Sequence, residues 1–311
     1  MKYRWILLVE LIILLGLGAC TLQETPAQVQ VVTFTPSISV PPTESNKSVP
    51  SITESPSQTE STELTATTTT TPPPLSCWNE GGYTQHHQLF SDFLPDPLIF
   101  RVHLPPCYDQ QPEKEYPILY LLHGQSYGDD QWDRLGVDET ADRLIALGEI
   151  PPFIIVLPAE QDHNTPPPES PYGDAIVNEL LPYINETYRI IDKRAYRAIG
   201  GLSRGGNWAV HLGLIHWELF GTFGAHSSPS FVTEGPPRIR EYLQAIPDDK
   251  LPHIYMDAGE NDGWIEYTLK LEAVFTEENI PHEWFLFQGT HDEEYWANHI
   301  EDYLRWYTQG W

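Results

Sequence analysis

Basic residues are scarce in this chain: 17 Lys and Arg stand against 44 Asp and Glu, for a formal net charge of −27. Nucleic-acid binders take much of their affinity from Lys and Arg on phosphates, so this balance argues against such a partner. The 3 Cys exclude a disulfide-dense scaffold and a zinc site of four thiolates. No His or Cys cluster has metal-ligand spacing, and no Gly-rich loop carries a Lys for phosphates, so the sequence predicts no metal and no cofactor.

The first 20 residues predict an export signal. Two basic residues precede an apolar run over 6–17, and Leu17-Gly18-Ala19-Cys20 places small residues before a Cys. This order resembles a bacterial lipobox, in which the Cys is lipidated, although Glu10 interrupts the run. A single spanning anchor is the alternative, but 6–19 is shorter than the roughly 20 residues that cross a bilayer. Either way, we expect the rest of the chain outside the cytoplasm, anchored to the membrane by lipid or secreted.

Residues 21–76 have the composition of a linker. More than half of them are Thr, Ser or Pro, and Phe34 is the only aromatic. Such a segment cannot bury enough apolar surface to offset its chain entropy, so we expect a disordered tether. Residues 77–311 have a size ordinary for one α/β domain. Cys77 and Cys107 are the only thiols in it, which in an exported domain favours a disulfide over two buried free thiols.

Apolar runs and helical periodicity alternate along this domain. Strands are predicted over 98–104, 118–122, 153–157, 196–200, 222–225, 254–258 and 283–287. Helices are predicted over 137–147, 174–188, 207–216, 266–278 and 294–307, with Pro182 expected to bend or break the second. This alternation predicts a mostly parallel sheet with helices on both faces. In such sheets the reactive site lies where the strands end.

Gly201-Leu202-Ser203-Arg204-Gly205 follows one predicted strand directly and leads into a predicted helix. This is the context that a nucleophile elbow requires, and the glycines allow the crowded turn that exposes the Ser203 hydroxyl. The alternative is a glycine-rich turn with an exposed Ser. A bare serine needs an adjacent base.

His291 follows the strand over 283–287 and precedes the last helix, so it is the predicted base, with His226 as the runner-up. Asp262 lies in the loop after the strand over 254–258 and is the predicted acid, where it would fix the imidazole tautomer. Asp257 and Glu260 are the alternatives, and a solvated acidic loop would explain all three.

An oxyanion hole needs two backbone N–H groups. One is expected from Arg204, directly after the serine. The other is expected from Gln125 in His123-Gly124-Gln125, which follows the strand over 118–122. His123 is interpreted as a structural hydrogen bonder rather than a second base.

Five stretches together resemble the putative-esterase family of α/β-hydrolases, which includes feruloyl and acetylxylan esterases, S-formylglutathione hydrolase, enterochelin esterases and mycolyltransferases. They are 104–109, 116–124, 179–184, the elbow at 201–205, and His291-Asp292 with Trp296 behind. The resemblance implies an α/β-hydrolase fold, no cofactor, and nucleophile, acid and base at Ser203, Asp262 and His291. Two positions depart from the family. Cys107 stands where Gly is usual, and Arg204 stands where many members carry Met, so the Arg204 side chain could favour anionic acyl groups.

The sequence and the resemblance together predict a serine esterase acting on an extracytoplasmic, carbohydrate-linked ester such as a feruloyl or acetyl ester. A siderophore or other small-ester esterase, an acyltransferase and a non-catalytic surface binding module of the same fold are the alternatives. Five aromatic residues near the expected site loops could stack on substrate, although packing would also explain them: Tyr127, Trp132, Tyr172, Trp208 and Trp264.

Overall fold

The computed structural model describes residues 76–311. Its centre is one 8-stranded sheet in the order β1-β2-β4-β3-β5-β6-β7-β8. β1 pairs antiparallel with β2, and β2 pairs antiparallel with β4. The other six strands, β3 to β8, are parallel to one another. The strands are β1 (Tyr83–Leu89), β2 (Leu98–Leu104), β3 (Ile118–Leu122), β4 (Ile154–Pro158), β5 (Arg197–Leu202), β6 (Thr222–His226), β7 (His253–Gly259) and β8 (Glu283–Phe287).

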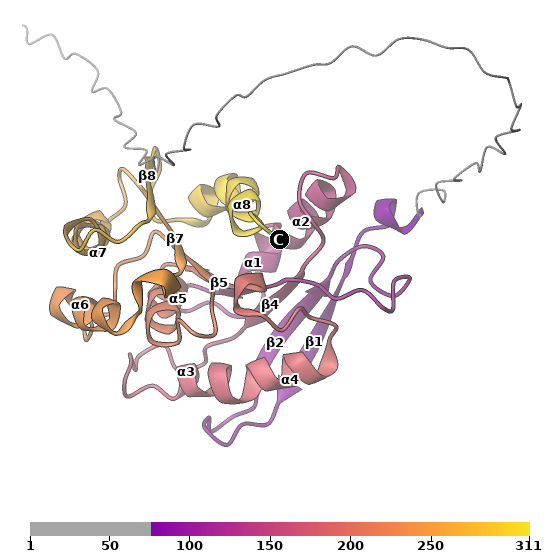
Figure 1. Cartoon of the computed structure of the whole chain (residues 1–311), viewed down its shortest axis with the longest axis horizontal. Helices are drawn as coiled ribbons and strands as arrows, with labels where there is room; N and C mark the ends of the chain where they lie inside the picture. The colour runs from indigo at the N-terminus through magenta and orange to yellow at the C-terminus, as the bar shows by residue number, and fades with distance from the viewer. Residues whose placement is uncertain (1–75) are drawn as a thin grey trace, which may run out of the picture. The chain divides into compact units, whose positions relative to one another are not determined.

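Helices cover both faces of this sheet, as the sequence predicts (Figure 1). One face packs on α3 (Tyr172–Ala175), α4 (Leu181–Thr187), α5 (Arg204–Ile215), α6 (Pro236–Ala245) and α7 (Ile265–Glu277). The other packs on α1 (Gln131–Arg134), α2 (Val137–Ala146) and α8 (Glu293–Tyr307). Along β3 the side chains alternate between the two cores: Tyr120 lies in the first and Leu121 in the second. The central strands are therefore buried on both faces, which explains their continuous apolar runs.

The predicted helix over 174–188 does not break at Pro182. The chain passes from α3 through a π-helical segment, Ile176–Leu180, into α4, whose first turn contains Pro182. Proline lacks an N–H and crowds the preceding turn, and the wider π turn accommodates it without ending the helix.

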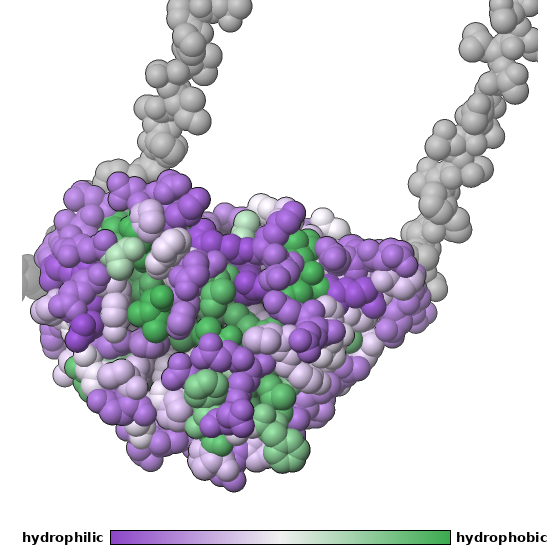
Figure 2. Space-filling view, turned by 60° about the horizontal axis from the view of Figure 1, so that its bottom comes forward, coloured by the Kyte–Doolittle hydropathy of each residue, from purple (hydrophilic) through white to green (hydrophobic). Residues whose placement is uncertain are grey.

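Hydrophilic side chains dominate the face shown in Figure 2, where they surround a few separate apolar patches, one of them along a central hollow. Within residues 76–311, no helix is long and apolar enough to cross a membrane. The predicted signal over 1–20, the predicted lipidation at Cys20 and all but the last residue of the predicted linker over 21–76 lie outside the described residues.

Candidate active site

Ser203 lies alone in a sharp turn between β5 and α5. β5 ends at Leu202 and α5 begins at Arg204, and Ser203 has φ 53° and ψ −121°. Non-glycine residues rarely adopt positive φ, and such strain persists only where the surroundings hold it. A Cβ atom at Gly201 would collide with the backbone of Gly205, and one at Gly205 with the Leu122 carbonyl. Glycine is therefore required at both positions for the turn that presents Ser203 at the carboxyl edge of the sheet.

Three side chains from separate loops form a hydrogen-bonded chain at this edge. The Ser203 hydroxyl donates to His291 Nε2 at 2.8 Å, and His291 Nδ1–H donates to Asp262 Oδ2 at 2.9 Å. The second oxygen of Asp262 accepts the Trp264 N–H at 2.7 Å, and Asp262 is only 2% exposed. The structure thus brings together the three residues that the sequence analysis singled out, with the geometry of a nucleophile, a base and an orienting acid.

Backbone contacts hold the acid and base loops against each other. The Glu260 N–H donates to the Phe287 carbonyl at 2.7 Å, and the Asn261 N–H to the Gly289 carbonyl at 2.9 Å. The rings of Trp296 and His291 pack in a T-shaped arrangement, with centroids 5.1 Å apart. The imidazole is therefore fixed by its loop, its carboxylate partner and an aromatic neighbour.

Gly124 lies beside the serine in the loop after β3. A Cβ atom built on Gly124 would lie 3.6 Å from Ser203 Cβ. The Gly124 N–H donates to Gln131 Oε1 at 2.8 Å, so this amide is occupied. The next amide, Gln125 N–H, and the first amide of α5, Arg204 N–H, have no acceptor within the described residues. These two groups remain available to bind an oxyanion.

Gln131, which no sequence pattern marks, connects the loop after β3 (residues 123–130) to α8. Gln131 is fully buried, and besides accepting from Gly124 it donates through Nε2 to Glu293 Oε1 at 3.1 Å. Glu293 begins α8 two residues after His291 and also pairs with Arg134 at 3.1 Å. Gln131 opens a helix of only four residues, too short for periodicity to reveal.

The runner-up base and acid are paired with each other instead of with Ser203. His226 and Asp257 are fully buried, and His226 Nδ1 bonds Asp257 Oδ1 at 2.7 Å. The hydroxyls of Tyr295 and Tyr303 donate to Asp257 Oδ2 at 2.5 and 2.9 Å. Since α8 carries both tyrosines, this network joins α8 to the sheet.

His123 accepts the Glu160 N–H at Nε2 over 2.7 Å and bonds the Gly124 carbonyl through Nδ1 at 2.7 Å. Burial lowers the pKa of His123 to about 4, so the ring is neutral near pH 7 and its proton is on Nδ1. His123 therefore links the loop after β3 to the loop after β4 by hydrogen bonds.

Three of the five aromatic residues expected to contact substrate are core residues, which corrects that expectation. Trp132, Tyr172 and Trp208 are at most 3% exposed. The Trp132 N–H donates to the Leu122 carbonyl at 2.9 Å, and the Tyr172 hydroxyl to the Pro158 carbonyl at 3.3 Å. Their large apolar rings contribute more by filling the core than at the surface. Tyr127 and Trp264 are 44% and 52% exposed, so their rings are free to contact a bound molecule.

The expectation for the Arg204 side chain also needs correction. Its guanidinium is buried in an ion pair with Glu160, with both N···O distances 2.6 Å, so its charge is already neutralised. It cannot attract an anionic acyl group as an unpaired cation would.

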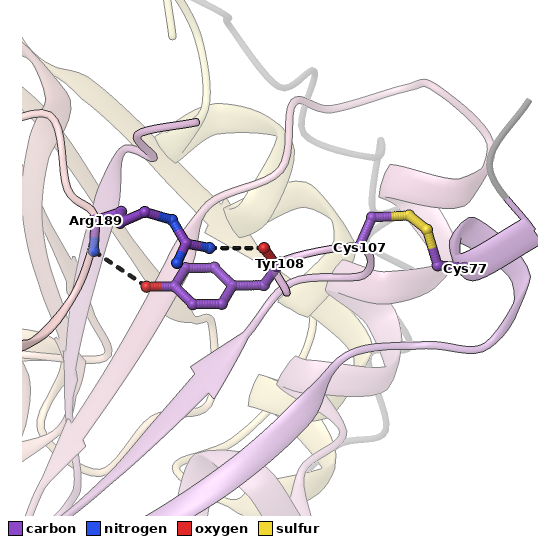
Figure 3. The surroundings of a disulfide bond; sticks show 4 residues. All are labelled: Cys77, Cys107, Tyr108 and Arg189. Atoms are coloured by element: carbon purple, nitrogen blue, oxygen red, sulfur yellow. Dashed lines mark hydrogen bonds between the residues drawn. A yellow bond between two sulfur atoms is a disulfide. The ribbon is translucent and has the colours of Figure 1, made fainter. Parts of the chain in front are cut away.

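Cys77 and Cys107 form a disulfide that ties η1 (Ser76–Asn79) to the segment after β2 (Figure 3). Cys107 has φ 65°, a left-handed conformation that favours glycine. The next residue, Tyr108, accepts Arg189 Nη2–H at its carbonyl over 2.6 Å, and the guanidinium lies over its ring (Figure 3).

Comparisons with known proteins agree with this architecture. A family model described as "Putative esterase" matches residues 91–307. An endo-1,4-beta-xylanase/feruloyl esterase of Xylanibacter ruminicola is 29% identical over 129 residues, 39% of this chain and 18% of that protein. An acetyl esterase of Caldicellulosiruptor saccharolyticus is 24% identical over 226 residues, 61% of this chain and 83% of that protein. A solved ferulic acid esterase is 28% identical with a TM-score of 0.66, covering 74% of this chain and 98% of that chain.

This chain thus covers less than a fifth of the length of the xylanase/feruloyl esterase and most of the length of the acetyl esterase. The solved structures confirm the predicted α/β-hydrolase fold.

Proposed function

The chain belongs to the putative esterase family, and we propose that it is a serine ester hydrolase with Ser203, His291 and Asp262 as nucleophile, base and acid. The observation that carries this proposal is the unbroken hydrogen-bond chain from the Ser203 hydroxyl through His291 to buried Asp262. It occurs at a strained turn beside two amides without protein acceptors within residues 76–311. That combination is what acyl transfer by a serine requires.

In the first half of the proposed reaction, His291 Nε2 takes the hydroxyl proton as Ser203 Oγ bonds to the ester carbonyl carbon. The carbonyl oxygen becomes an oxyanion and accepts the N–H groups of Gln125 and Arg204. The carbon–alkoxy bond then breaks, and the imidazolium returns its proton to the leaving alcohol. Asp262 holds Nδ1–H and stabilises the imidazolium without taking the proton.

In the second half, His291 removes a proton from water as its oxygen attacks the acyl-enzyme. Collapse of the second tetrahedral intermediate returns the proton to Ser203 Oγ and releases the carboxylic acid. No cofactor takes part in either half of this cycle.

We further propose an extracytoplasmic, carbohydrate-linked ester, of feruloyl or acetyl type, as the substrate. Two relatives support this choice by their names, one an endo-1,4-beta-xylanase/feruloyl esterase and one an acetyl esterase. Residues 1–20, as an export signal lipidated at Cys20, and 21–76, as a tether, would display the domain over 77–311 outside the membrane. The exposed rings of Tyr127 and Trp264 would be available for stacking on a sugar or a phenolic acyl group.

Hydrolysis of a panel of esters tests both parts of the proposal. The panel is methyl ferulate, acetylated xylan, p-nitrophenyl acetate and a catecholate-siderophore ester. We expect turnover of at least one of the first two, and a loss of several powers of ten for S203A on every member. Full activity of S203A on p-nitrophenyl acetate would overturn the assignment of the nucleophile. A clear preference for the siderophore ester would overturn only the substrate class.

A further inference from the structure

The side chain of Arg204 forms a buried, bidentate ion pair directly beside the nucleophile. Its Nε and Nη2 groups donate to the two carboxylate oxygens of Glu160, each at 2.6 Å. Arg204 is 9% exposed and Glu160 is 4% exposed. Charges leave water at a high cost unless their hydrogen bonds are well satisfied, and two parallel N–H···O bonds meet that condition. The pair is therefore a defined structural element with a net charge near zero.

Loops from three strands converge on this pair. Arg204 Nη2 also donates to the Thr165 carbonyl at 2.9 Å, in the loop that carries Glu160 after β4. The Phe231 ring, from the loop after β6, lies 5.2 Å from the guanidinium. The Glu160 N–H donates to His123, in the oxyanion loop after β3. Arg204 thus connects the loops that surround Ser203.

The strand order indicates which part of a bound ester faces the pair. β5 carries Ser203, and the strands that carry Asp262 and His291 lie on one side of it, while β4 lies on the other. His291 must reach the leaving alcohol to protonate it, so the alcohol lies toward β8. The acyl group then extends in the opposite direction, toward the loop after β4 and its Glu160.

We propose that the Arg204–Glu160 pair determines acyl specificity by leaving no unpaired cation at this end of the site, so that uncharged acyl groups are selected over anionic ones. This inference rests on the proposed function, because it requires that Ser203 receives the acyl group. Nη1 of Arg204 makes no hydrogen bond within the described residues, so it can donate to a neutral acceptor such as a hydroxyl, methoxy or carbonyl oxygen. Glu160 prevents this donor from acting as an unpaired cation.

Two esters that differ only in acyl charge test the proposal: mono-p-nitrophenyl adipate, whose distal carboxylate is ionised at pH 8, and its methyl ester. For the wild type we expect kcat/KM for the methyl ester to be at least about tenfold higher. In E160Q the charge of Arg204 is no longer balanced, so the preference should shift toward the anionic ester by about tenfold. In R204M the carboxylate of Glu160 is unbalanced, so the preference should shift further toward the methyl ester.

Opposite shifts from the two partners of one ion pair distinguish charge selection from mere disorder of the loops, which would lower both rates alike. The matched controls are E278Q and R240M, which break the surface pair between Arg240 and Glu278 and should leave the ratio unchanged. Labelling of Ser203 by a fluorophosphonate shows that each variant keeps its reactive site.

Unchanged ratios in both E160Q and R204M would overturn the proposal, as would shifts in the same direction. If neither variant folds, the wild type decides, since a preference for the anionic ester would overturn the proposal without any variant. Wild-type protein that hydrolyses neither ester and takes no label would instead contradict the proposed function.

Discussion

Two buried aspartates, one in β7 and one in the loop after it, each accept a hydrogen bond from an imidazole. Asp257 accepts from His226, and Asp262 accepts from His291. Only the second imidazole reaches a serine, while His226 Nε2 meets the Tyr307 hydroxyl at 2.9 Å. The same residue types thus join α8 to the sheet in one place and, in the proposed mechanism, orient a base in the other.

Replacing each aspartate by asparagine should separate these roles. We expect D262N to lower kcat by about three to four powers of ten with little loss of stability, because an amide at this position no longer enforces the Nδ1–H tautomer. D257N should lower the melting temperature by several degrees, because it weakens a buried network, and should retain most activity per folded molecule. Thermal unfolding and steady-state kinetics on both variants check this. The reverse pattern would make Asp257 the acid.

Gln131 is expected to act on kcat rather than on KM. In Q131A the Gly124 N–H loses its acceptor, so the neighbouring Gln125 N–H is held less firmly where charge develops in the transition state. We expect kcat to fall by roughly 10- to 100-fold with KM changed less than about twofold. The double variant Q131E/E293Q keeps an acceptor for the Gly124 N–H and restores a donor and an acceptor between positions 131 and 293, so it should retain more activity. Equal losses in the two variants, or a loss confined to KM, would argue against this role.

Residues were predictable from sequence where a motif or a strand end marks them. Ser203 has its glycines, and His291 and Asp262 each follow an apolar run that ends where the site must be. Glu160 also lies just after a strand, but its partner Arg204 comes from another segment that only the fold brings near, and Gln131 lies nine residues beyond β3 with no motif around it. The buried rings of Trp132, Tyr172 and Trp208 could not be distinguished from substrate platforms, because sequence position near a site does not report burial.

At the scale of elements, the central parallel strands were predictable because burial on both faces makes them continuously apolar. β1 was missed because it is a largely polar edge strand that is nowhere fully buried. α1 has only four residues, and α6 begins with two prolines, Pro236 and Pro237, which suit the start of a helix but suggest a loop in isolation. Tertiary packing decides the structure of such segments.

The His123 contacts predict how acid affects the loops after β3 and β4. The folded protein holds the pKa of His123 at about 4, below its ordinary 6.5, because burial disfavours the imidazolium. The unfolded chain therefore binds a proton at His123 at a higher pH than the folded protein does. The His123 contribution to the free energy of unfolding is thus fully present above pH 6.5 and is lost as the pH falls from 6.5 to 4. The loss amounts to roughly 3 kcal/mol at its limit.

Denaturant unfolding of wild type and H123Q across pH 4–7 measures this contribution. The wild-type free energy of unfolding should fall more steeply between pH 6.5 and 4 than that of H123Q, which has no group titrating at this position. Parallel curves would mean that His123 does not carry the acid sensitivity.

At the scale of the whole molecule, the two ends of the parallel strands carry different features. The parallel strands end at the edge that carries Ser203, Asp262 and His291. β2 runs antiparallel to β4, so it ends at the opposite edge, where Cys107 follows it and is joined to Cys77. The proposed catalytic groups and the disulfide therefore lie at opposite ends of the parallel strands.

Removing the disulfide should therefore reduce stability and spare chemistry. The cysteines are 30 residues apart in sequence, and closing a loop of that size restricts the unfolded chain by roughly 3–4 kcal/mol. For a domain of this size, we expect the C77S/C107S variant to melt roughly 10 °C lower. Its kcat/KM at 25 °C should stay within about twofold of the wild type. A large loss of activity in protein that is still folded would contradict this separation.

The most direct test of the account is to map the site of fluorophosphonate labelling by mass spectrometry of the intact protein and its peptides. The account predicts one adduct per molecule, on Ser203, absent in S203A and formed at least about a thousandfold more slowly in H291A. Labelling of another residue, or undiminished labelling of S203A, would contradict the claim that Ser203 is the nucleophile activated by His291.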